Sequence, residues 1–239
     1  MRLIQEGNLL QLTWLPRFFP VNCYFVIEDQ GLTLIDAGMS YCLKGIVSTA
    51  AKLNKPVTRI ILTHAHADHV GALDVVKQHY PEAVVYISSR DAALLAGDQS
   101  LWPGEPQTPI KGSVPSKVTT KPDVLLEDGD SVGSLRAVST PGHTPGSMSF
   151  LDSRSNAVIA GDAFQTFGRV AVAGTVVPWF PFPAMATWNK EQAVSSAERL
   201  LKLSPSVLAA GHGNLLKAPA DQMKQAIRTA QIQLKKEGE

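Results

Sequence analysis

Four side chains able to bind metal ions stand within six consecutive residues of this sequence. His64, His66 and His69 supply three imidazoles, and Asp68 supplies a carboxylate. Imidazole nitrogen is a common zinc ligand, and a carboxylate oxygen can bind the same ion or hold a second one. A dense His/Asp cluster of this kind is among the stronger short sequence signals for a metal site. The alternative is a solvated polar loop that carries four unrelated residues.

The cluster lies between a predicted strand and a predicted helix. Residues Thr58–Leu62 end in an apolar run, which indicates a buried strand. Residues Val70–His79 carry apolar side chains at helical spacing, so we expect a helix that begins at or just after His69. The four polar side chains therefore belong to a short loop at a strand end, where α/β folds bind their ligands.

Three more ligand-type residues follow predicted strands. His143, Asp162 and His212 each come after an apolar segment, in a loop rich in glycine. Taken alone, Asp162 is better explained as a turn residue or helix cap, and the two histidines are equally well explained as loop residues. Five of the six histidines lie in these loops and in the first cluster, and that concentration favours a shared metal site. The sixth, His79, we interpret as a surface histidine at a helix end.

Asp36 has a different predicted role. It ends a predicted strand and stands before Ala37-Gly38. A metal-binding imidazole needs its second nitrogen held by a hydrogen bond, so we interpret Asp36 as the acceptor that orients such a ring. The alternative is an ordinary hydrogen-bonded turn residue.

Strands and helices alternate loosely, and each half of the chain begins with antiparallel hairpins. The other predicted strands are Leu9–Leu15, Val21–Glu28, Leu32–Asp36, Val84–Ile87, Val124–Leu126, Leu135–Ser139, Met148–Leu151, Ala157–Ala160 and Val207–Ala210. The other predicted helices are Cys42–Leu53, a short helix capped by Ser88–Asp91 and ending at Leu95, Lys190–Leu203 with Thr187 or Asn189 as its cap, and about Pro219–Lys235. This pattern predicts an α/β (α+β) fold with two mixed sheets packed together and helices outside.

The chain length of 239 residues fits one large domain, which we place at 1–239. We expect two pseudo-equivalent halves, roughly 1–115 and 116–239. The segment 97–123 lies near their boundary, and its many prolines and glycines predict a long irregular loop.

Composition excludes several classes of partner. Hydrophobic residues make up 44% and charged residues 18% of the chain, as in ordinary globular proteins. The formal net charge of +1 gives no basic surplus for nucleic acid, so we expect a small-molecule substrate. No apolar run approaches membrane-spanning length, and the N-terminus carries no secretory signal, so we expect no membrane association. The two cysteines, Cys23 and Cys42, do not suggest a disulfide framework; free buried thiols and a cytoplasmic location are our expectation.

The ligand-type residues, taken in order, resemble the metallo-β-lactamase-fold hydrolases. The resemblance covers nearly the whole chain and rests on His64-Ala65-His66-Ala67-Asp68-His69, His143, Asp162 and His212, with Leu34-Ile35-Asp36-Ala37-Gly38 and Thr140-Pro141-Gly142-His143-Thr144-Pro145-Gly146-Ser147. It implies an αββα sandwich, in which two mixed β-sheets lie between helices. This agrees with the fold class expected from the order of strands and helices.

The resemblance also implies a binuclear metal centre with two zinc ions per chain. One ion would be held by His64, His66 and His143. The other would be held by Asp68, His69 and His212, with Asp162 bridging the two. A bridging aspartate is similar to the glyoxalase II, lactonase and esterase branches rather than to the true β-lactamases. Histidine rather than glutamate at position 66 departs from the oxygen-reducing diiron relatives, which favours zinc over iron.

The expected reaction is a metal-dependent hydrolysis. Metal ions lower the pKa of bound water, so hydroxide can attack a carbonyl carbon at neutral pH. Asp68 is the expected catalytic residue, because it would orient that nucleophile. Neither cysteine lies near a ligand motif, so covalent catalysis finds no support. The resemblance allows a small ester, a lactone or a thioester as the substrate.

Aromatic residues in two irregular segments are candidates for the substrate pocket. The segments 97–123 and 164–186 carry them, and the candidate wall residues are Trp102, Phe164, Phe167, Trp179 and Phe182. The alternative for each is core or cap packing. Glyoxalase II-like enzymes add a C-terminal helical region that grips glutathione, whereas this chain ends soon after one predicted helix.

Two other classes of function remain as alternatives. A β-lactam hydrolase is disfavoured by Asp162 and by the absence of an export signal. A non-catalytic metal-binding protein on the same fold is disfavoured because a degenerate relative would have lost ligands, and none is missing here.

We predict that Asp68→Ala removes hydrolytic activity and leaves the fold almost unchanged, because Asp68 orients the nucleophile. Turnover of a generic ester and a thermal unfolding curve would measure the two effects separately. Full activity in the variant would refute the mechanism.

Overall fold

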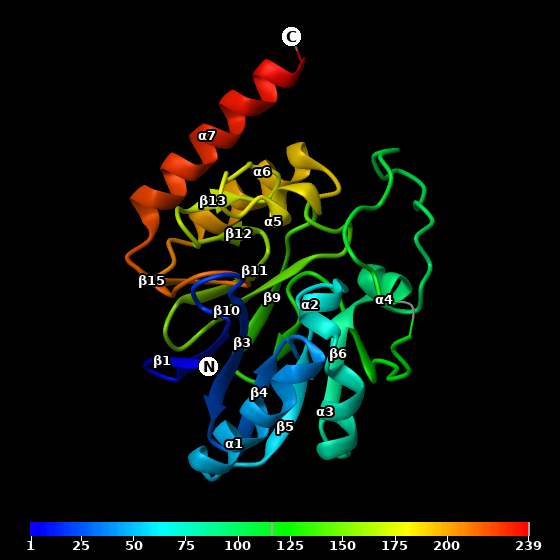
Figure 1. The fold of residues 1–239 in the computed structure, drawn as a ribbon, viewed down its shortest axis with the longest axis vertical. Helices are drawn as coiled ribbons and strands as arrows, with labels where there is room; N and C mark the ends of the chain where they lie inside the picture. The colour runs from blue at the N-terminus through cyan, green and yellow to red at the C-terminus, as the bar shows by residue number, and fades with distance from the viewer. Residues whose placement is uncertain (116, 239) are drawn as a thin grey trace. The chain divides into compact units, whose positions relative to one another are not determined.

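The computed structural model describes residues 1–115 and 117–238 of the chain. Contacts between Cα atoms divide the chain into two compact units. The first unit comprises Met1–Asp98 and Val114–Leu126, and the second comprises Gln99–Ser113 and Glu127–Glu239. Ser116, where the second half was predicted to begin, lies outside the described residues. The two units are described separately below (Figure 1).

The first unit is built on a seven-stranded mixed sheet with the strand order β1-β2-β3-β4-β5-β6-β7. Its strands are β1 (Arg2–Glu6), β2 (Leu9–Trp14), β3 (Val21–Glu28), β4 (Gly31–Ile35), β5 (Val57–Ile61), β6 (Val84–Ser88) and β7 (Val124–Leu126). Its helices are the 3₁₀ turn η1 (Ser40–Cys42), α1 (Leu43–Leu53), α2 (Ala67–Val70), α3 (Leu73–His79) and α4 (Ser89–Leu95).

Strand direction in the first unit changes at β4. Strands β1 to β4 pair antiparallel, whereas β4, β5, β6 and β7 pair parallel. A parallel neighbour requires a crossover, and helices α1 and α3 provide the crossovers from β4 to β5 and from β5 to β6. Figure 1 shows both helices on one side of these strands, as right-handed crossovers require. The C-terminal ends of β4, β5 and β6 therefore share one edge of the sheet.

The second unit contains a six-stranded mixed sheet with the order β15-β14-β11-β10-β9-β8 and a separate pair, β12-β13. The strands are β8 (Ser131–Val132), β9 (Leu135–Ser139), β10 (Met148–Asp152), β11 (Ala157–Gly161), β12 (Phe164–Gln165), β13 (Ala171–Val172), β14 (Val207–Ala210) and β15 (Leu216–Lys217). The helices are α5 (Phe182–Met185), α6 (Lys190–Lys202) and α7 (Ala220–Gly238). Helices α6 and α7 contact each other and β13 (Figure 1).

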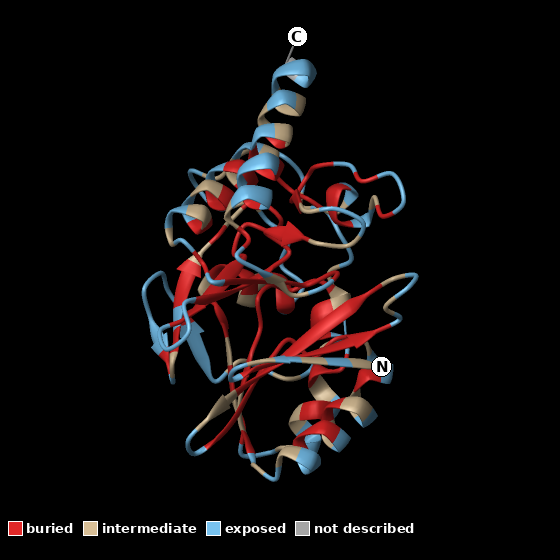
Figure 2. Cartoon of the chain, turned by 90° about the vertical axis from the view of Figure 1, so that its left-hand side faces the viewer, coloured by how far each residue is buried: buried red, intermediate tan, exposed pale blue. Residues whose placement is uncertain are grey.

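Strands β9, β11 and β14 of the second unit run in the same direction. Strand β10 pairs antiparallel with both β9 and β11, and β11 pairs parallel with β14. Their C-terminal ends therefore lie at one edge of this sheet, as do those of β4, β5 and β6 in the first. Strands β2, β4, β10 and β11 are buried along their whole length, whereas β1 alternates between partly buried and exposed residues (Figure 2).

The predicted fold class, α/β with two mixed sheets and helices, is confirmed. Strands Val21–Glu28, Leu135–Ser139 and Val207–Ala210 have the predicted bounds. The short strands β8, β12, β13 and β15 and the helix α5 were not predicted, because segments of two to four residues show no periodicity. Asn189 is the cap of α6, since its Oδ1 accepts the Gln192 N–H at 2.8 Å.

The predicted helix Val70–His79 is wrong at its start. A four-residue helix α2 contains Asp68 and His69, and α3 begins only at Leu73. The carbonyl oxygen of His69 accepts N–H groups from Ala37 and Gly38, at 2.7 and 3.0 Å. Backbone contacts from another segment therefore interrupt the helix, and local sequence does not reveal them.

Both cysteines are free and buried, as expected. Burial raises the pKa of the Cys42 thiol to about 12, although a backbone hydrogen bond from Met39 lowers it in part. Burial also raises the pKa of Cys23 well above its ordinary value, and the neighbouring Cys42 adds to this effect. Neither group is a thiolate near neutral pH, so neither serves as a nucleophile. Among the described residues, no helix is both long and apolar enough to span a membrane.

The carboxylate of Asp74 attaches the end of the long loop, which belongs to the first unit, to helix α3. Asp74 of α3 accepts the backbone N–H groups of Thr119 and Thr120 and both of their hydroxyl groups, at 2.6 to 3.1 Å. Partial burial alone would raise the pKa of Asp74, but these hydrogen bonds outweigh it and the net pKa lies below its ordinary value. The loop is irregular, as predicted, yet it is firmly attached to α3.

We predict that Asp74→Ala lowers the free energy of unfolding by about 1–2 kcal/mol, since solvent weakens partly exposed charge-assisted hydrogen bonds. A lowered pKa stabilises the fold above the ordinary pKa of aspartate, and this contribution disappears as the pH falls through the lowered value. Urea unfolding of both proteins should therefore give curves that converge below about pH 4. A difference that grows at low pH would contradict the assignment.

Candidate functional site

The predicted ligands of the first unit lie at the shared edge of its parallel strands. Strand β4 leads into Asp36, and β5 leads into Thr63 and His64. Since β4 and β5 pair parallel, both loops emerge side by side. The structure therefore brings the first cluster and Asp36 together, although 27 residues separate Asp36 from Thr63.

The four side chains of the first cluster converge. The ring of His64 has its centroid 4.8 Å from that of His66 and 4.1 Å from that of His69. Asp68 Oδ2 lies 3.8 Å from His69 Nε2. All three imidazoles are buried, whereas the Asp68 side chain keeps 24% of its surface exposed. The predicted loop is thus a compact set of nitrogen and oxygen donors, with its carboxylate at the edge.

Asp36 holds two of these imidazoles. Its Oδ2 accepts the Nδ1–H of His69 at 2.8 Å and the hydroxyl hydrogen of Thr63 at 2.8 Å. Because the Thr63 hydroxyl donates to Asp36, its oxygen accepts the Nδ1–H of His64, 3.0 Å away. Both rings therefore carry hydrogen on Nδ1, which leaves the lone pair on Nε2 for a metal ion. Asp36 accepts these hydrogen bonds as predicted.

The three predicted ligands of the second unit also converge. Asp162 Oδ2 lies 3.3 Å from His143 Nε2 and 3.2 Å from His212 Nε2. All three side chains are buried. They follow β9, β11 and β14, whose C-terminal ends share one edge of the sheet.

Thr187 fixes the protonation of His143. Its hydroxyl donates to the carbonyl oxygen of Pro183 at 2.7 Å, so its oxygen accepts the Nδ1–H of His143 at 3.2 Å. The Nε2 of His143 then carries a lone pair, and that lone pair faces the carboxylate of Asp162. Two acceptor atoms this close repel unless positive charge lies between them. A proton on Nε2 or a metal cation bound by both atoms satisfies this arrangement.

Two glycines permit the loops to approach their neighbours. A Cβ on Gly142 would lie 2.3 Å from the backbone N of Ala193 at the start of α6. A Cβ on Gly213 would lie 2.4 Å from the backbone N of Phe167. Both residues also have positive φ, which disfavours any other residue type. The glycines beside His143 and His212 are therefore required by packing.

Aromatic residues lie against His212. The ring of Phe180 has its centroid 5.1 Å from the His212 ring, and Phe167 and Phe182 contact Phe180 at 5.3 and 5.5 Å. The Phe182 side chain is half exposed. Phe164, by contrast, is fully buried in the core of the second unit, so the expectation that it lines a pocket is wrong.

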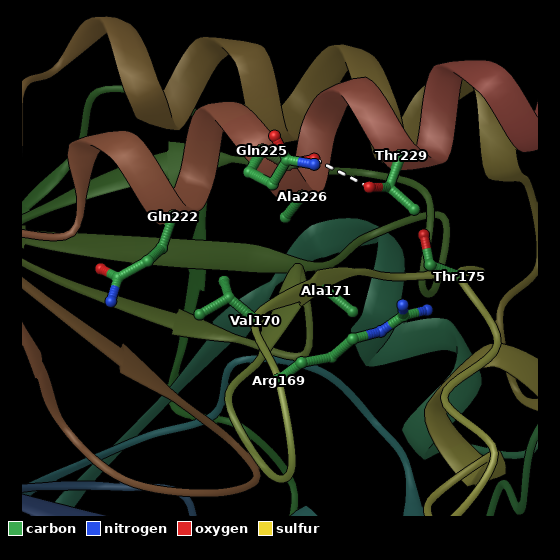
Figure 3. Close-up of a pocket in the computed structure, with 8 residues that line it drawn as sticks. All are labelled: Arg169, Val170, Ala171, Thr175, Gln222, Gln225, Ala226 and Thr229. Atoms are coloured by element: carbon green, nitrogen blue, oxygen red, sulfur yellow. Dashed lines mark hydrogen bonds between the residues drawn. The ribbon is translucent and has the colours of Figure 1, made fainter.

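A groove of about 240 Å³ lies apart from these residues, between the segment 169–175 and α7 (Figure 3). It is lined by Arg169, Val170, Ala171, Thr175, Gln222, Gln225, Ala226 and Thr229. None of the lining residues is a predicted ligand. Arg169 donates a hydrogen bond to the carbonyl oxygen of Val176 at 2.8 Å.

Sequence reasoning missed three residues that contact the predicted ligands. Thr63 stands directly before His64, and that position was the only available signal. Thr187 was considered as a helix cap, and Phe180 was not among the candidate wall residues. The partner of Thr187 lies 44 positions away in the sequence and that of Phe180 is also distant, so only the tertiary structure reveals these contacts.

Comparison with known proteins gives a family and a fold. A family model described as the metallo-beta-lactamase superfamily matches residues 16–212. The protein YobT of Bacillus subtilis (strain 168), described as uncharacterized, is 54% identical over 96% of this chain and 99% of its own length. The probable metallo-hydrolase YflN of the same strain is 32% identical over 80% of each chain. The hydroxyacylglutathione hydrolase GloC of Haemophilus influenzae is 26% identical over 82% of this chain and 87% of its own.

Two solved structures show the same fold. A metallo-beta-lactamase from Pontibacter korlensis is 16% identical and superposes with a TM-score of 0.72, covering 96% of this chain and 98% of its own. TTHA1623 in a di-iron-bound form is 25% identical with a TM-score of 0.64, covering 88% of this chain and 96% of its own. The predicted metallo-β-lactamase fold is therefore confirmed. The di-iron form means that the fold does not by itself select zinc.

We predict that Thr187→Val lowers the free energy of unfolding by about 1–3 kcal/mol, because buried hydrogen-bonding groups of Pro183 and His143 lose their partner. The His143 ring should then no longer be held with hydrogen on Nδ1. Long-range ¹H–¹⁵N NMR of the histidine rings would report this change.

Thr175→Val is the matched control for this experiment. Thr175 is buried in the same unit, and its hydroxyl has no hydrogen-bond partner among the residues that the structure describes. Its replacement should leave both the stability and the His143 spectrum close to the wild type. Equal behaviour of the two variants would mean that Thr187 does not hold His143.

Proposed function

The chain belongs to the metallo-beta-lactamase superfamily, and on this premise we propose that it is a zinc-dependent hydrolase of small carbonyl esters, lactones or thioesters. Metallo-hydrolase relatives support the reaction class. The observation that carries the proposal is the convergence of His143 Nε2 and Asp162 Oδ2 at 3.3 Å with the His143 Nδ1–H held by Thr187, because a metal ion bound by both atoms would satisfy this arrangement.

We propose seven residues as the metal ligands. His64, His66 and His143 would hold one ion. Asp68, His69 and His212 would hold a second, and Asp162 would bind both. Neutral imidazole nitrogens and carboxylate oxygens suit zinc, and they also suit iron(II). The fixed Nε2 lone pairs of His64, His69 and His143 support the assignment, because imidazole binds metal through the nitrogen that carries no hydrogen.

The bound ions would supply Lewis acidity toward a carbonyl oxygen and would acidify water. The chain's own residues would supply orientation and a proton acceptor. The carboxylate of Asp68 is suited to accept the proton of the attacking water, because it is the more exposed of the two carboxylates among the proposed ligands. The buried histidines, held by Asp36, Thr63 and Thr187, would keep the donor set rigid.

The surroundings of His212 favour a substrate with an apolar acyl group. Phe180 contacts the His212 ring, Phe182 contacts Phe180, and Phe182 is half exposed. These rings form an apolar path from a proposed ligand to the surface of the second unit. The relative GloC is described as a hydroxyacylglutathione hydrolase, and a thioester is included among the test substrates for that reason. A net charge of +1 supports a small-molecule partner over nucleic acid.

We expect metal-stripped protein to lose hydrolysis of a test ester at least about a hundredfold, since no side chain replaces the Lewis acidity of the ions. Zinc should restore the rate at two equivalents per chain. Iron(II), added without oxygen, should be compared in parallel. Restoration by neither metal would overturn the proposal.

A substrate panel would define the class of bond. It should contain a lactone, a thioester, an aliphatic ester, a phosphoester and a chromogenic cephalosporin. Turnover of the first three, and not of the last two, is the expected result. Preferential turnover of the cephalosporin would instead assign β-lactam hydrolysis, and no turnover of any substrate by metal-loaded protein would indicate a non-catalytic metal-binding protein.

A further inference from the structure

The imidazole rings of His64 and His66 lie close together, and one residue separates them in the sequence. The ring centroids of these two histidines are only 4.8 Å apart, with planes at 83°. The intervening residue Ala65 is fully buried, so its peptide N–H needs an internal partner. A buried group must therefore accept the N–H of Ala65, in the backbone that joins the two rings.

That group is the carboxylate of Asp91. Its Oδ2 accepts the Ala65 N–H at 2.9 Å, and Asp91 is itself fully buried. Asp91 is the third residue of α4, which follows β6, and β6 pairs parallel with β5. The start of α4 consequently lies beside the loop that leaves β5. A hydrogen bond to a charged carboxylate is about twice as strong as a neutral one, and it is strongest where water is excluded.

The sequence suggested only a capping role for Asp91. Ser88 is the cap of α4, and its Oγ accepts the Asp91 N–H at 3.0 Å. An acidic residue three positions after a serine cap usually reaches back to the cap backbone. Here Asp91 Oδ2 contacts a residue 26 positions earlier in the chain. The helix cap is made by Ser88, so the carboxylate of Asp91 serves a second purpose.

We propose that Asp91 is a positioning residue for the metal-binding loop: its carboxylate holds the Ala65 peptide and thereby sets the spacing of His64 and His66. This inference rests on the proposed function, because it takes these two histidines as ligands of one ion. In the proposal, Asp91 acts through the peptide that joins the two imidazole-bearing residues. Its replacement should therefore change metal affinity rather than the identity of the ligands.

The test compares Asp91→Ala with Ser88→Ala in the full-length chain. Cobalt(II) is the probe, because its visible absorption reports both affinity and coordination geometry. Asp91→Ala should lower cobalt affinity about 10- to 100-fold and alter the absorption bands, as loss of a residue that supports a metal ligand does. Ser88→Ala removes the hydroxyl that caps the same helix through the Asp91 N–H and keeps the Asp91 carboxylate that accepts the Ala65 N–H, so its cobalt affinity and spectrum should match the wild type.

Asp91→Asn provides a conservative variant, since an amide oxygen can still accept the Ala65 N–H. We expect its cobalt affinity to stay within about threefold of the wild type. Its Ala65 amide proton should move upfield, because the hydrogen bond to a neutral amide is weaker. Should Asp91→Ala not fold, the wild type and Asp91→Asn still decide the question through this amide proton, and an unmoved resonance would overturn the proposal.

Other outcomes separate this inference from the proposed function. Equal loss of cobalt affinity in Asp91→Ala and Ser88→Ala would reduce Asp91 to a structural residue of α4. Unchanged affinity in Asp91→Ala would overturn its positioning role while the ligand assignment stands. A wild-type protein that binds no cobalt would overturn the ligand assignment, and this inference with it.

Discussion

The buried carboxylate of Asp36 is the interaction on which the first unit's donor set depends. One oxygen of this group accepts hydrogen from His69 directly and from Thr63, and Thr63 in turn accepts hydrogen from His64. The backbone around Asp36 is held as well, since the His69 carbonyl oxygen accepts the N–H groups of the next two residues. Asp36 adopts a positive φ of 58°, a conformation that a residue other than glycine keeps only when its surroundings impose it. The carboxylate at the end of β4 therefore determines that Nδ1 carries hydrogen in both His64 and His69, and it orients both rings.

In the second unit a neutral hydroxyl, rather than a charged carboxylate, orients an imidazole, and such a hydrogen bond is weaker. His143 is oriented by the neutral hydroxyl of Thr187, whose own hydrogen is directed to the Pro183 carbonyl. The segment that carries Thr187 is attached to the His143 loop through the backbone: Trp188 N–H donates to the His143 carbonyl at 3.0 Å, and Asn189 N–H donates to Gly142 at 2.9 Å. The same segment brings Phe180 against His212. One segment, residues 180–189, therefore both orients His143 and places an apolar ring against His212. In the proposed function, this segment links metal binding to the choice of substrate.

Both units place their polar residues by the same geometric rule. Strands that run in one direction end at one edge of a sheet, so short loops after them bring distant residues together. The parallel order β4-β5-β6 joins Asp36, the histidine cluster and Asp91, and the common direction of β9, β11 and β14 joins His143, Asp162 and His212. Rigid strands support these loops, and this allows a site built on loops to keep a fixed geometry.

The sequence by itself determined the class of fold and which residues are the candidate donors. Apolar runs that stop at His64, His143, Asp162 and His212 are local features, and the order of these residues is specific to one superfamily. What only the tertiary structure decided is how the donors are held. Thr187 and Asp91 form hydrogen bonds with groups that are distant in the sequence, and Thr63 accepts hydrogen from His64 because Asp36 fixes the direction of its hydroxyl. The break between α2 and α3 comes from the two residues after Asp36, whose N–H groups bind the His69 carbonyl oxygen. Serine, threonine and aspartate have the same local signature in a cap, a turn or a support for a ligand, because their chemistry depends on the partner. The fold, rather than the neighbouring sequence, supplies that partner.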